Sequence, residues 1–498
     1  MKRLLPHALL AAGFLALTGC ASYSGIAPIA KFLDIRPLLA KEEPKSDANW
    51  PQENWWLALN DPALTGLIDQ ALLGNPGLQI ATARLDQVRA ISGQAESSLW
   101  PQLNFSLSST RERFSERGLI PPPYAGTRQN INDVQLNGNW EIDFFGKNRE
   151  GLRAALGELR ASEAEHQASR LLLASNVARG YYNLARLLAQ HQLAEQRQKQ
   201  RLDLAALVER RFKAGLDTRV ELESAQGVIP ENARDIAALD EQIGLARHAL
   251  AALTGQGPNA VDGLAPALPA ASQFALPQNL PADLLGHRAD IVAARWHVES
   301  AVHSLDATRA LFYPNINLHA FTGFSAIGFD NWLDAGSRQP GIGIAVSLPL
   351  FDAGRLRNQY RVSAALVDSS IATYNGTLLD ALRDVADQLT TLDSLDIQRA
   401  RQQAALDSAE RAYDLALQRY RADISDRLSV LNMETNLIAQ RRAAVDLQAR
   451  QVDTRIRLIN ALGGGFQETP GAASGYPGSA KNSKNLPSAS PNTPGLSS

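Results

Sequence analysis

The sequence predicts an α+β membrane protein built from two tandem copies of a strand, strand and long helical hairpin unit. Three observations lead to this fold class. The stretch from Lys147 to Arg211 has 65 residues without proline and is rich in residues that favour helices. Four sequence motifs recur at nearly constant spacing along the chain. Segments that alternate apolar and polar residues precede each long helical stretch.

The stretch from Lys147 to Arg211 is predicted to form one continuous helix, about 97 Å long at 1.5 Å per residue. An amphipathic helix on a globular core is the alternative, but helices average only about 11 to 12 residues. Small and apolar positions alternate in steps of four and three, as in a coiled-coil seam. They are Leu171, Ser175, Ala178, Tyr182, Ala185, Ala189 and Leu193.

The second half of the chain repeats the first, which indicates a tandem duplication. Three pairs of motifs are offset by 208 residues and the pair around Pro101 and Pro314 by 213, so the first copy has an insertion around 117–130. The pairs are LWPQLNFSLS (99–108) with LFYPNINLHAF (311–321), DFFGKNR (143–149) with FDAGRLR (351–357), RFKAGLDTRVELESAQ (211–226) with RYRADISDRLSVLNME (419–434), and ALTGQG (252–257) with NALGGG (460–465).

Residues 1–19 have the pattern of a secretory signal peptide, with Lys2 and Arg3 before an apolar run too short to span a membrane in the mature protein. The sequence LTGC resembles the bacterial lipobox, which implies cleavage before Cys20 and acylation of that residue. Ala21 follows, which implies sorting to the outer membrane. A plain leader with a coincidental cysteine is the alternative. Cys20 is the only cysteine, so no intramolecular disulfide is possible.

The composition is that of an ordinary folded protein, with 45% hydrophobic and 20% charged residues. The formal net charge of -2 gives no basic excess, so we expect no nucleic-acid partner. From Ala21 to about Asn60 the chain is irregular, and we expect this tether to pack its tryptophans against the body. These are Trp50, Trp55 and Trp56.

Four segments alternate with period two; in the first, Leu103, Phe105 and Leu107 face one side and polar residues the other. Such strands fit a transmembrane barrel around water, because spanning strands need about 9 to 11 residues. A soluble sandwich with one wet face is the alternative. Four strands cannot close a barrel, and an open edge in lipid leaves backbone groups unpaired. Either the strands do not lie in a membrane or several chains share one barrel, and three copies would give twelve strands.

The return arm from Leu216 to Thr254 and the next helix, from Pro281 to Ala310, have 39 and 30 residues. Placed end to end they span about 103 Å, which matches the outgoing helix. The chain between them is rich in Pro, Gly and Ala and should form an irregular belt at mid-length. Pro230 falls inside the return arm, where we expect a kink.

These elements define the domain organisation. It consists of a signal peptide (1–19), a lipid-anchored tether and equatorial segment (20–60), a first repeat (61–257, with strands at about 102–114 and 131–144 and a helical hairpin at 147–254), an equatorial linker (258–280), a second repeat (281–466, with strands at about 315–328 and 340–350 and a hairpin at 353–462) and a disordered tail (467–498).

Several segments resemble the TolC-type outer-membrane efflux proteins, in their OprM/NodT-like lipoprotein branch, over nearly all of 20–466. The most specific is LLGHRADIVAARWHVESA (284–301), which resembles the RPDI-x-x-AE segment of that branch with Ala289 for proline and Arg295 for glutamate. LWPQL, LFDAGRLR, RFKAGL and VIPENARDIAALDEQIGLARHALAALTG (228–255) match further.

The resemblance implies a homotrimer with a twelve-stranded barrel above a twelve-helix periplasmic α-barrel. It also implies docking through a periplasmic adaptor protein to an inner-membrane efflux pump, and a place in the outer membrane of a Gram-negative bacterium. A duct of this kind needs a gate at its closed end, where both hairpins turn. Family members constrict this tip with aspartates and with hydrogen bonds or ion pairs of tyrosine and arginine. The second turn supplies Tyr420, Asp423, Asp426 and Arg427.

Asp423 stands where the first copy has Gly215, a departure from the glycine of the family that puts the shape of the second turn in question. In a trimer an inward aspartate would form a ring of three negative charges. Contact with the adaptor would use the same tips, at Phe212, Gly215 and Leu216. The alternative is that all these side chains are solvated turn residues.

The predicted function is passive conduction of small molecules, such as drugs and toxic organic compounds, from pump and adaptor to the exterior. A conduit for type I protein secretion is the alternative; lipidation and the RADI segment favour efflux. An enzyme lacks support, because no H-E-x-x-H, G-x-S-x-G or P-loop motif occurs. The eight histidines are scattered without metal-ligand spacing, so we expect no metal, cofactor or catalytic residue. A structural coiled coil would leave the strands unexplained.

Overall fold

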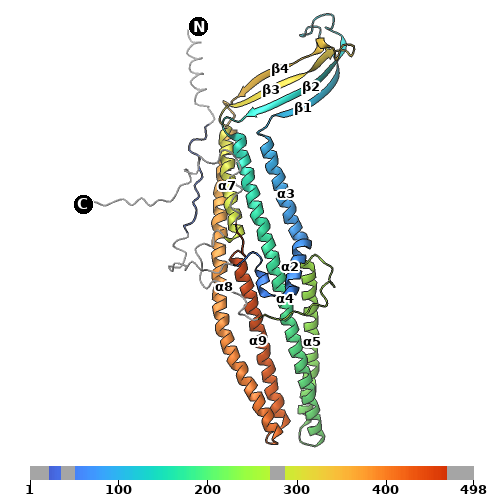
Figure 1. The fold of residues 1–498 in the computed structure, drawn as a ribbon, viewed down its shortest axis with the longest axis vertical. Coiled ribbons are helices and arrows are strands. Elements are labelled where there is room, and N and C mark those ends of the chain that lie inside the picture. Colours follow the sequence, from blue (N-terminus) through green and yellow to red (C-terminus); the bar gives the residue numbers. More distant parts are fainter. Residues whose placement is uncertain (1–21, 35–50, 270–286, 468–498) are drawn as a thin grey trace, which may run out of the picture.

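The protein is an elongated molecule with a β-sheet at one end and two helical hairpin tips at the other (Figure 1). The structure is a computed structural model that describes residues 22–34, 51–269 and 287–467. Two helices of 67 residues, α4 (Lys147–Lys213) and α8 (Arg355–Arg421), run from the sheet to the tips. Each is about 100 Å long at 1.5 Å per residue, as expected from the absence of proline in both.

Each long helix begins after a glycine in the left-handed region, Gly146 with φ of 83° and Gly354 with φ of 86°. An aspartate just before each glycine accepts a hydrogen bond from a backbone N–H of the first turn. Asp143 accepts one from Arg149 at 2.8 Å, and Asp352 accepts one from Leu356 at 2.8 Å. The recurring Asp and Gly motifs are therefore helix starts.

The four strands form one antiparallel sheet in the order β1 (Gln102–Arg113), β2 (Arg128–Ile142), β3 (Asn315–Ile327) and β4 (Gly341–Ser347). β4 ends three residues before the predicted end because a proline two positions later cannot donate to the ladder. β1 and β4 are edge strands, and each pairs on one side only within the chain.

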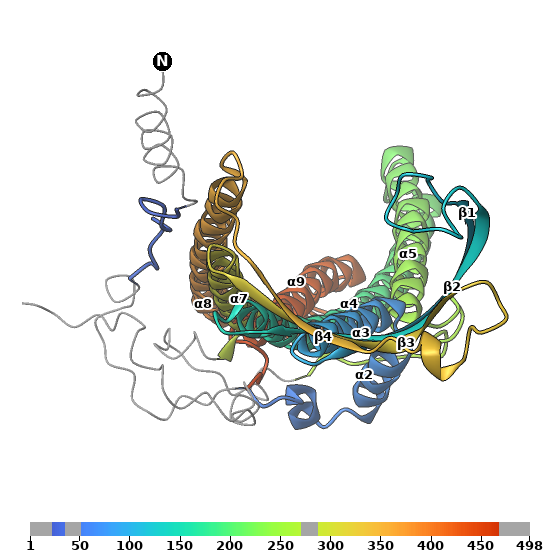
Figure 2. The ribbon, with the colours of Figure 1, turned by 90° about the horizontal axis from the view of Figure 1, so that it is seen from above.

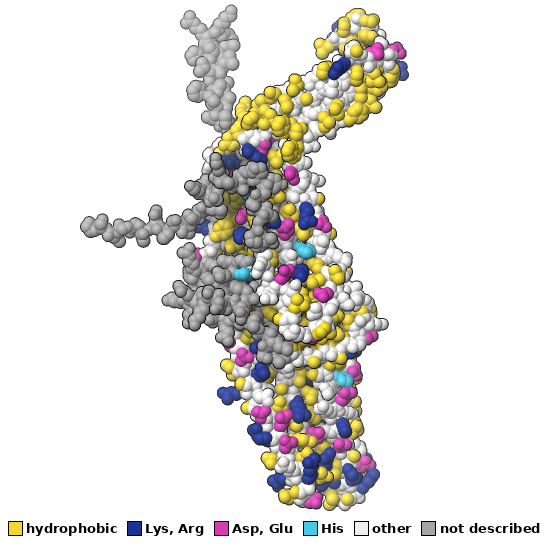
Figure 3. All heavy atoms as spheres, viewed as in Figure 1, with side chains coloured by type: hydrophobic (Ala, Val, Ile, Leu, Met, Phe, Trp, Pro, Cys, Tyr) yellow, Lys and Arg dark blue, Asp and Glu magenta, His cyan; other side chains and the backbone are white. Residues whose placement is uncertain are grey.

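The register aligns apolar residues of neighbouring strands on one face of the sheet. Phe105 lies opposite Leu136, and Leu318 lies opposite Ile344. This face is open, since Phe105 is 68% exposed and Ile344 is 69% exposed. Figure 3 shows hydrophobic side chains gathered over the sheet and its junction with the helices, while charged ones gather over the lower helices.

The shorter helices lie along the two long ones. They are α2 (Pro62–Gly74), α3 (Pro76–Ser97), α5 (Arg219–Leu253), α7 (Ala289–Ala310) and α9 (Arg427–Ala461). α3 and α5 contact α4, whereas α7 and α9 contact both α4 and α8. Pro230 lies inside α5. None of the described helices is long and apolar enough to cross a membrane.

The prediction that the first return arm and the helix of residues 281–310 lie end to end is wrong. Figure 1 shows α3 above α5 and α7 above α9. The reason is the apolar surface of α7, which is buried on two sides. Val292 packs with Ala161 of α4, and Val298 packs with Tyr360 of α8. α7 therefore fills the groove between the long helices, which α5 does not enter.

The main core lies at mid-length, where η1 (Trp55–Leu59) and α2 pack against α4, α5 and α9. Trp55 and Trp56 are buried there, which confirms the packing predicted for these two tryptophans; Trp50 lies outside the described residues. The predicted seam of α4 is buried from Leu171 to Ala185. Equivalent glycines end the two return arms, because another backbone crosses there. A Cβ on Gly255 would lie 2.2 Å from the carbonyl oxygen of Gly74.

The described N-terminal segment, residues 22–34, runs along α8. The backbone N–H groups of Ile29 and Ala30 donate to Asp368 at 2.8 and 2.7 Å. Tyr23 packs against Phe312 and Tyr360, where the sheet meets the helices. The predicted signal peptide and Cys20 lie outside the described residues, as do 270–280 of the predicted linker, 281–286 of the predicted second repeat and 468–498 of the predicted tail.

Candidate functional site

Two short turns form the tips of the hairpins, one between α4 and α5 and one between α8 and α9 (Figure 1). Both have the same hydrogen bonds, in which the left-handed residue donates back to the helix. Gly215 donates to Phe212 at 2.9 Å, and Asp423 donates to Tyr420 at 3.1 Å. Asp423 has a φ of 56°, close to the 74° of Gly215. The departure from glycine therefore leaves the shape of the turn unchanged.

The second tip brings together three side chains from three helices. The guanidinium of Arg427, at the start of α9, lies 5.7 Å from the ring centre of Tyr420 at the end of α8. Arg427 also forms an ion pair of 3.8 Å with Asp203 of α4. The structure thus joins the predicted Tyr420 and Arg427. Sequence reasoning missed Asp203, which no spacing or motif distinguishes from other acidic residues of α4.

Asp426 acts as the N-cap of α9 rather than as a partner of Arg427. Its carboxylate accepts hydrogen bonds from the backbone N–H of Ser429 at 2.9 Å and from the Ser429 hydroxyl at 2.6 Å. These bonds, and the charge of Arg211, lower the pKa of Asp426. Within the described ranges Asp423 has no ion pair or side-chain hydrogen bond.

The first tip is closed by its own ion pair. Arg211 donates to both carboxylate oxygens of Asp217 at 2.9 Å each, and this bidentate contact raises the pKa of Arg211. Phe212 and Leu216, which were predicted to contact an adaptor, are 37% and 68% exposed. Ile424, the counterpart of Leu216 in the second tip, is 67% exposed. Both tips therefore present apolar side chains to the surroundings.

A buried amide fixes α4 to α9 just above the tip. Gln200 of α4 is almost fully buried, and its amide donates to Thr435 of α9 at 2.6 Å and to the carbonyl oxygen of Leu431. Leu431 and Val430 are buried beside it. Gln200 lies one turn before Asp203 in α4. The Arg427–Asp203 ion pair is therefore next to a position where α4 and α9 are joined by buried hydrogen bonds.

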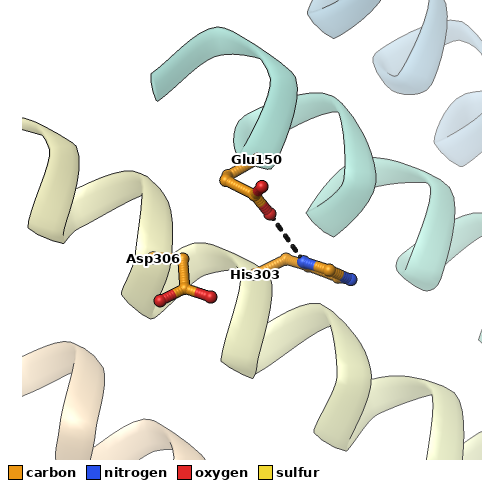
Figure 4. A group of neighbouring side chains, drawn as sticks. All are labelled: Glu150, His303 and Asp306. Carbon is orange, nitrogen blue, oxygen red and sulfur yellow. Dashed lines mark hydrogen bonds and ion pairs between the residues drawn. The ribbon is translucent and has the colours of Figure 1, made fainter. Parts of the chain in front are cut away.

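One histidine and two carboxylates come together near the start of α4 and the end of α7 (Figure 4). His303 and Glu150 share a hydrogen bond of 2.8 Å, and one ligand atom from each of Glu150, His303 and Asp306 lies within 4.8 Å of the others. Divalent metals accept such ligands. Glu150 also pairs with Arg153 of the same helix at 2.5 Å, while its hydrogen bond with His303 joins α4 to α7. The sequence spacing had not indicated it.

Comparison with known proteins gives one family. The model described as "Outer membrane efflux protein" matches residues 67–256 and 280–464, one match for each half of the chain. The fusaric acid resistance protein FusA of Burkholderia cepacia is 36% identical over 352 residues, 69% of this chain and 66% of that protein. The multidrug resistance outer membrane protein MdtQ of Escherichia coli O6:H1 is 30% identical over 427 residues, 84% of this chain and 89% of that protein.

Solved structures show the same architecture. The outer membrane protein VceC of Vibrio cholerae superimposes with a TM-score of 0.75 at 36% identity and covers 84% of this chain and 100% of its own. The CmeC outer membrane channel of Campylobacter jejuni, at 23% identity, shares the fold with a TM-score of 0.81 over 90% of this chain and 96% of its own.

Proposed function

The chain belongs to the outer membrane efflux protein family, and from this we propose that it is the outer-membrane channel of a tripartite efflux system. One observation carries the proposal: a sheet with an exposed apolar face stands on a curved wall of helices about 100 Å long (Figure 2). An apolar outer face of the sheet can contact membrane lipid, and a long curved wall of helices can enclose a passage across the periplasm. Such a duct carries solutes passively and makes or breaks no bonds.

Three copies complete the duct. Four strands from each chain give a twelve-stranded barrel in which β1 of one copy pairs with β4 of the next. The long helices and their short partners give a twelve-helix α-barrel below it. At the far end the tips meet a periplasmic adaptor and an inner-membrane pump, and the exposed Phe212 and Leu216 beside Gly215 supply apolar contacts for the adaptor.

The cargo consists of small molecules such as drugs and toxic organic compounds. Relatives are named for resistance to fusaric acid and to multiple drugs, which favours efflux over protein secretion. Purified protein added to planar lipid bilayers should produce a stepwise ion conductance. A bilayer that stays silent while the protein is inserted and trimeric would contradict the channel.

The gate consists of Tyr420, Arg427 and Asp203, whose contacts tie α8, α9 and α4 together at the second tip. Asp423 adds a charge that has no described partner, and Asp426 holds α9 in place as its cap. The substitution Arg427→Asp should raise single-channel conductance, and the swap Asp203→Arg with Arg427→Asp should lower it again. Arg219→Asp, at the first tip, is the matched control. Equal conductance in all four proteins would remove the pair from the gate.

Lipid at Cys20 anchors the protein in the outer membrane. Support comes from Ser22, whose carbonyl oxygen accepts a hydrogen bond of 2.8 Å from Arg357 at the start of α8, immediately below the sheet. The first described residue therefore lies beside the start of α8, next to the sheet that spans the membrane in the proposed barrel. Labelled palmitate should be incorporated into the wild type and not into Cys20→Ser. Equal labelling of both would contradict the anchor.

A further inference from the structure

The wall has two faces at mid-length, and they differ in chemistry. On α4, Val177, Tyr181 and Leu184 belong to the core formed with η1 and α2. Figure 2 shows α2 on the convex side of the curved wall. Because successive residues of a helix are about 100° apart, Arg179 and Arg186 lie on the opposite side of α4, which is concave. In the proposed trimer this concave side lines the tunnel.

A cavity of about 690 Å³ opens on this concave side between α4, α8 and α9. Four arginines and one aspartate are its charged lining residues: Arg179, Arg186, Arg450, Arg457 and Asp453. The aspartate is shared, since Arg179 approaches it to 2.6 Å and Arg457 to 2.7 Å. Amide and hydroxyl groups of Asn176, Asn183 and Thr391 also line the cavity. They are neutral donors that accompany an excess of positive charge.

A second cavity of about 610 Å³ continues the first toward the tips and shares Arg186. It adds Arg197, Arg201 and Arg442 and contains the aspartates Asp235 and Asp446. The pairs there are loose, with 3.5 Å between Arg186 and Asp446 and 3.9 Å between Arg197 and Asp235. We call the seven arginines of the two cavities the arginine track: Arg179, Arg186, Arg197, Arg201, Arg442, Arg450 and Arg457.

The arginine track is under-neutralised by its surroundings. The Nε of Arg201 is buried without a hydrogen-bond partner, and burial together with the charge of Arg197 lowers the pKa of Arg201. Arg442 and Arg450 are exposed and form no ion pair within the part of the chain that the structure describes. Three aspartates line the two cavities beside the seven arginines, and Glu231 adds a nearby negative charge that favours the charged form of Arg201. The linings of the two cavities therefore carry a local excess of positive charge.

We propose that the arginine track binds and guides organic anions, carboxylates above all, along the tunnel wall. The inference rests on the proposed channel function and specifies its cargo. A guanidinium offers a planar pair of N–H donors that matches a carboxylate, and three copies would repeat the track around the axis. A confined passage lined by one sign of charge raises the local concentration of the opposite ion. Arg442 and Arg450, which form no ion pair among the described residues, and the loosely paired Arg197 leave donors free for a passing anion.

The test is the ion selectivity of the full-length protein in planar bilayers. Reversal potentials under a potassium chloride gradient give the permeability ratio of chloride to potassium. A second measurement gives the permeability ratio of the organic anion benzoate to the organic cation benzylammonium. The test variant is Arg442→Gln with Arg450→Gln, which removes two exposed charges of the track. The matched control, Arg160→Gln with Arg170→Gln, removes two charges of α4 near Glu53 of the equatorial segment.

We expect the anion-to-cation ratio to fall at least threefold in the track variant for both ion pairs, and to stay at the wild-type value in the control. An unchanged ratio in the track variant, with normal conductance, would overturn the inference and leave the channel intact. An equal fall in both variants would also overturn it, because net charge alone would then set selectivity. If the wild-type protein itself showed no conductance, this result would instead contradict the proposed channel function.

Discussion

Asp423 occupies a backbone conformation that glycine occupies in the first hairpin. A residue with a Cβ is strained in the left-handed region, although aspartate tolerates it better than most. The two turns make equivalent hydrogen bonds, so the effect of glycine and of aspartate on stability can be compared at equivalent positions of the two tips.

Replacing Asp423 by glycine should stabilise the protein by about 0.5–1 kcal/mol, because the strain at this φ is removed. The reverse change, Gly215→Asp, should destabilise it by a similar amount. Thermal unfolding of the detergent-solubilised protein, followed by circular dichroism, measures both. A lower midpoint for Asp423→Gly would mean that the carboxylate stabilises the tip.

His297 of α7 is held between two carboxylates of α4. Its ring lies 3.1 Å from Glu158 and 3.0 Å from Glu165, and hydrogen bonds to these groups raise its pKa to about 10 from 6.5. The ring is therefore charged at neutral pH and joins α7 to α4. The scattered spacing of the histidines could not reveal this role, because the two carboxylates lie more than 130 residues away in sequence.

The contribution of His297 to stability should depend on pH. Below pH 6.5 the ring is protonated in both the folded and unfolded states, so the ion pairs contribute fully. As pH rises toward 10 the unfolded state loses its proton first, and the contribution falls. The difference in unfolding midpoint between wild type and His297→Gln should thus be largest at pH 6 and shrink by pH 10. A difference that grows with pH would refute this assignment.

Sequence reasoning predicted part of the candidate site. Tyr420 and Arg427 were both assigned to the second tip, and the structure brings their side chains together there, because they lie at the two ends of one short turn. Asp426 was assigned to the gate by resemblance, yet its carboxylate caps α9. The roles of Asp203 and Gln200 could not be predicted, because their partners depend on how α4 packs against α9. A single sequence holds no local signal for the packing of two helices so far apart along the chain.

At the scale of elements, the close approach of α4 and α7 depends on Gly157. A Cβ at this position would lie 3.0–3.1 Å from backbone and side-chain atoms of Ser300, so α7 would have to move by a few tenths of an ångström to admit a methyl group. Gly151, one and a half turns earlier in α4, has open space around it. The two glycines therefore serve different purposes in the same helix.

Gly157→Ala should destabilise the protein by about 1–3 kcal/mol, because α7 must shift away from α4. Gly151→Ala should stabilise it by up to about 1 kcal/mol, because alanine favours the helix and nothing obstructs it. Unfolding midpoints of the two variants should therefore move in opposite directions. Equal shifts would show that helix propensity alone governs both positions.

The long helices and the strands could be predicted because their signals are local. Absence of proline predicts α4 and α8, and alternation of apolar residues predicts the sheet. The placement of α7 could not be predicted from lengths alone, since two pairings of short helices match the long helix equally well. Burial of α7 against both long helices decides between them.

At the scale of the whole molecule, the edges of the sheet call for more than one chain. Electron microscopy of the detergent-extracted mature protein should show three-fold particles longer than the roughly 100 Å of α4. The strands add their own length beyond the helices. Compact monomeric particles would contradict the shared barrel and favour the alternative in which the sheet belongs to a soluble protein.

The unpaired edges of β1 and β4 also govern how the protein matures. A lone copy that entered the bilayer would carry both rows of free N–H and C=O groups into hydrocarbon, so insertion must await its neighbours. Insertion of the barrel would then require three copies to meet, so its rate should fall steeply when copies are scarce. The proposed lipid anchor would confine copies to the plane of the membrane and raise their effective concentration, so that three chains would meet faster at low expression.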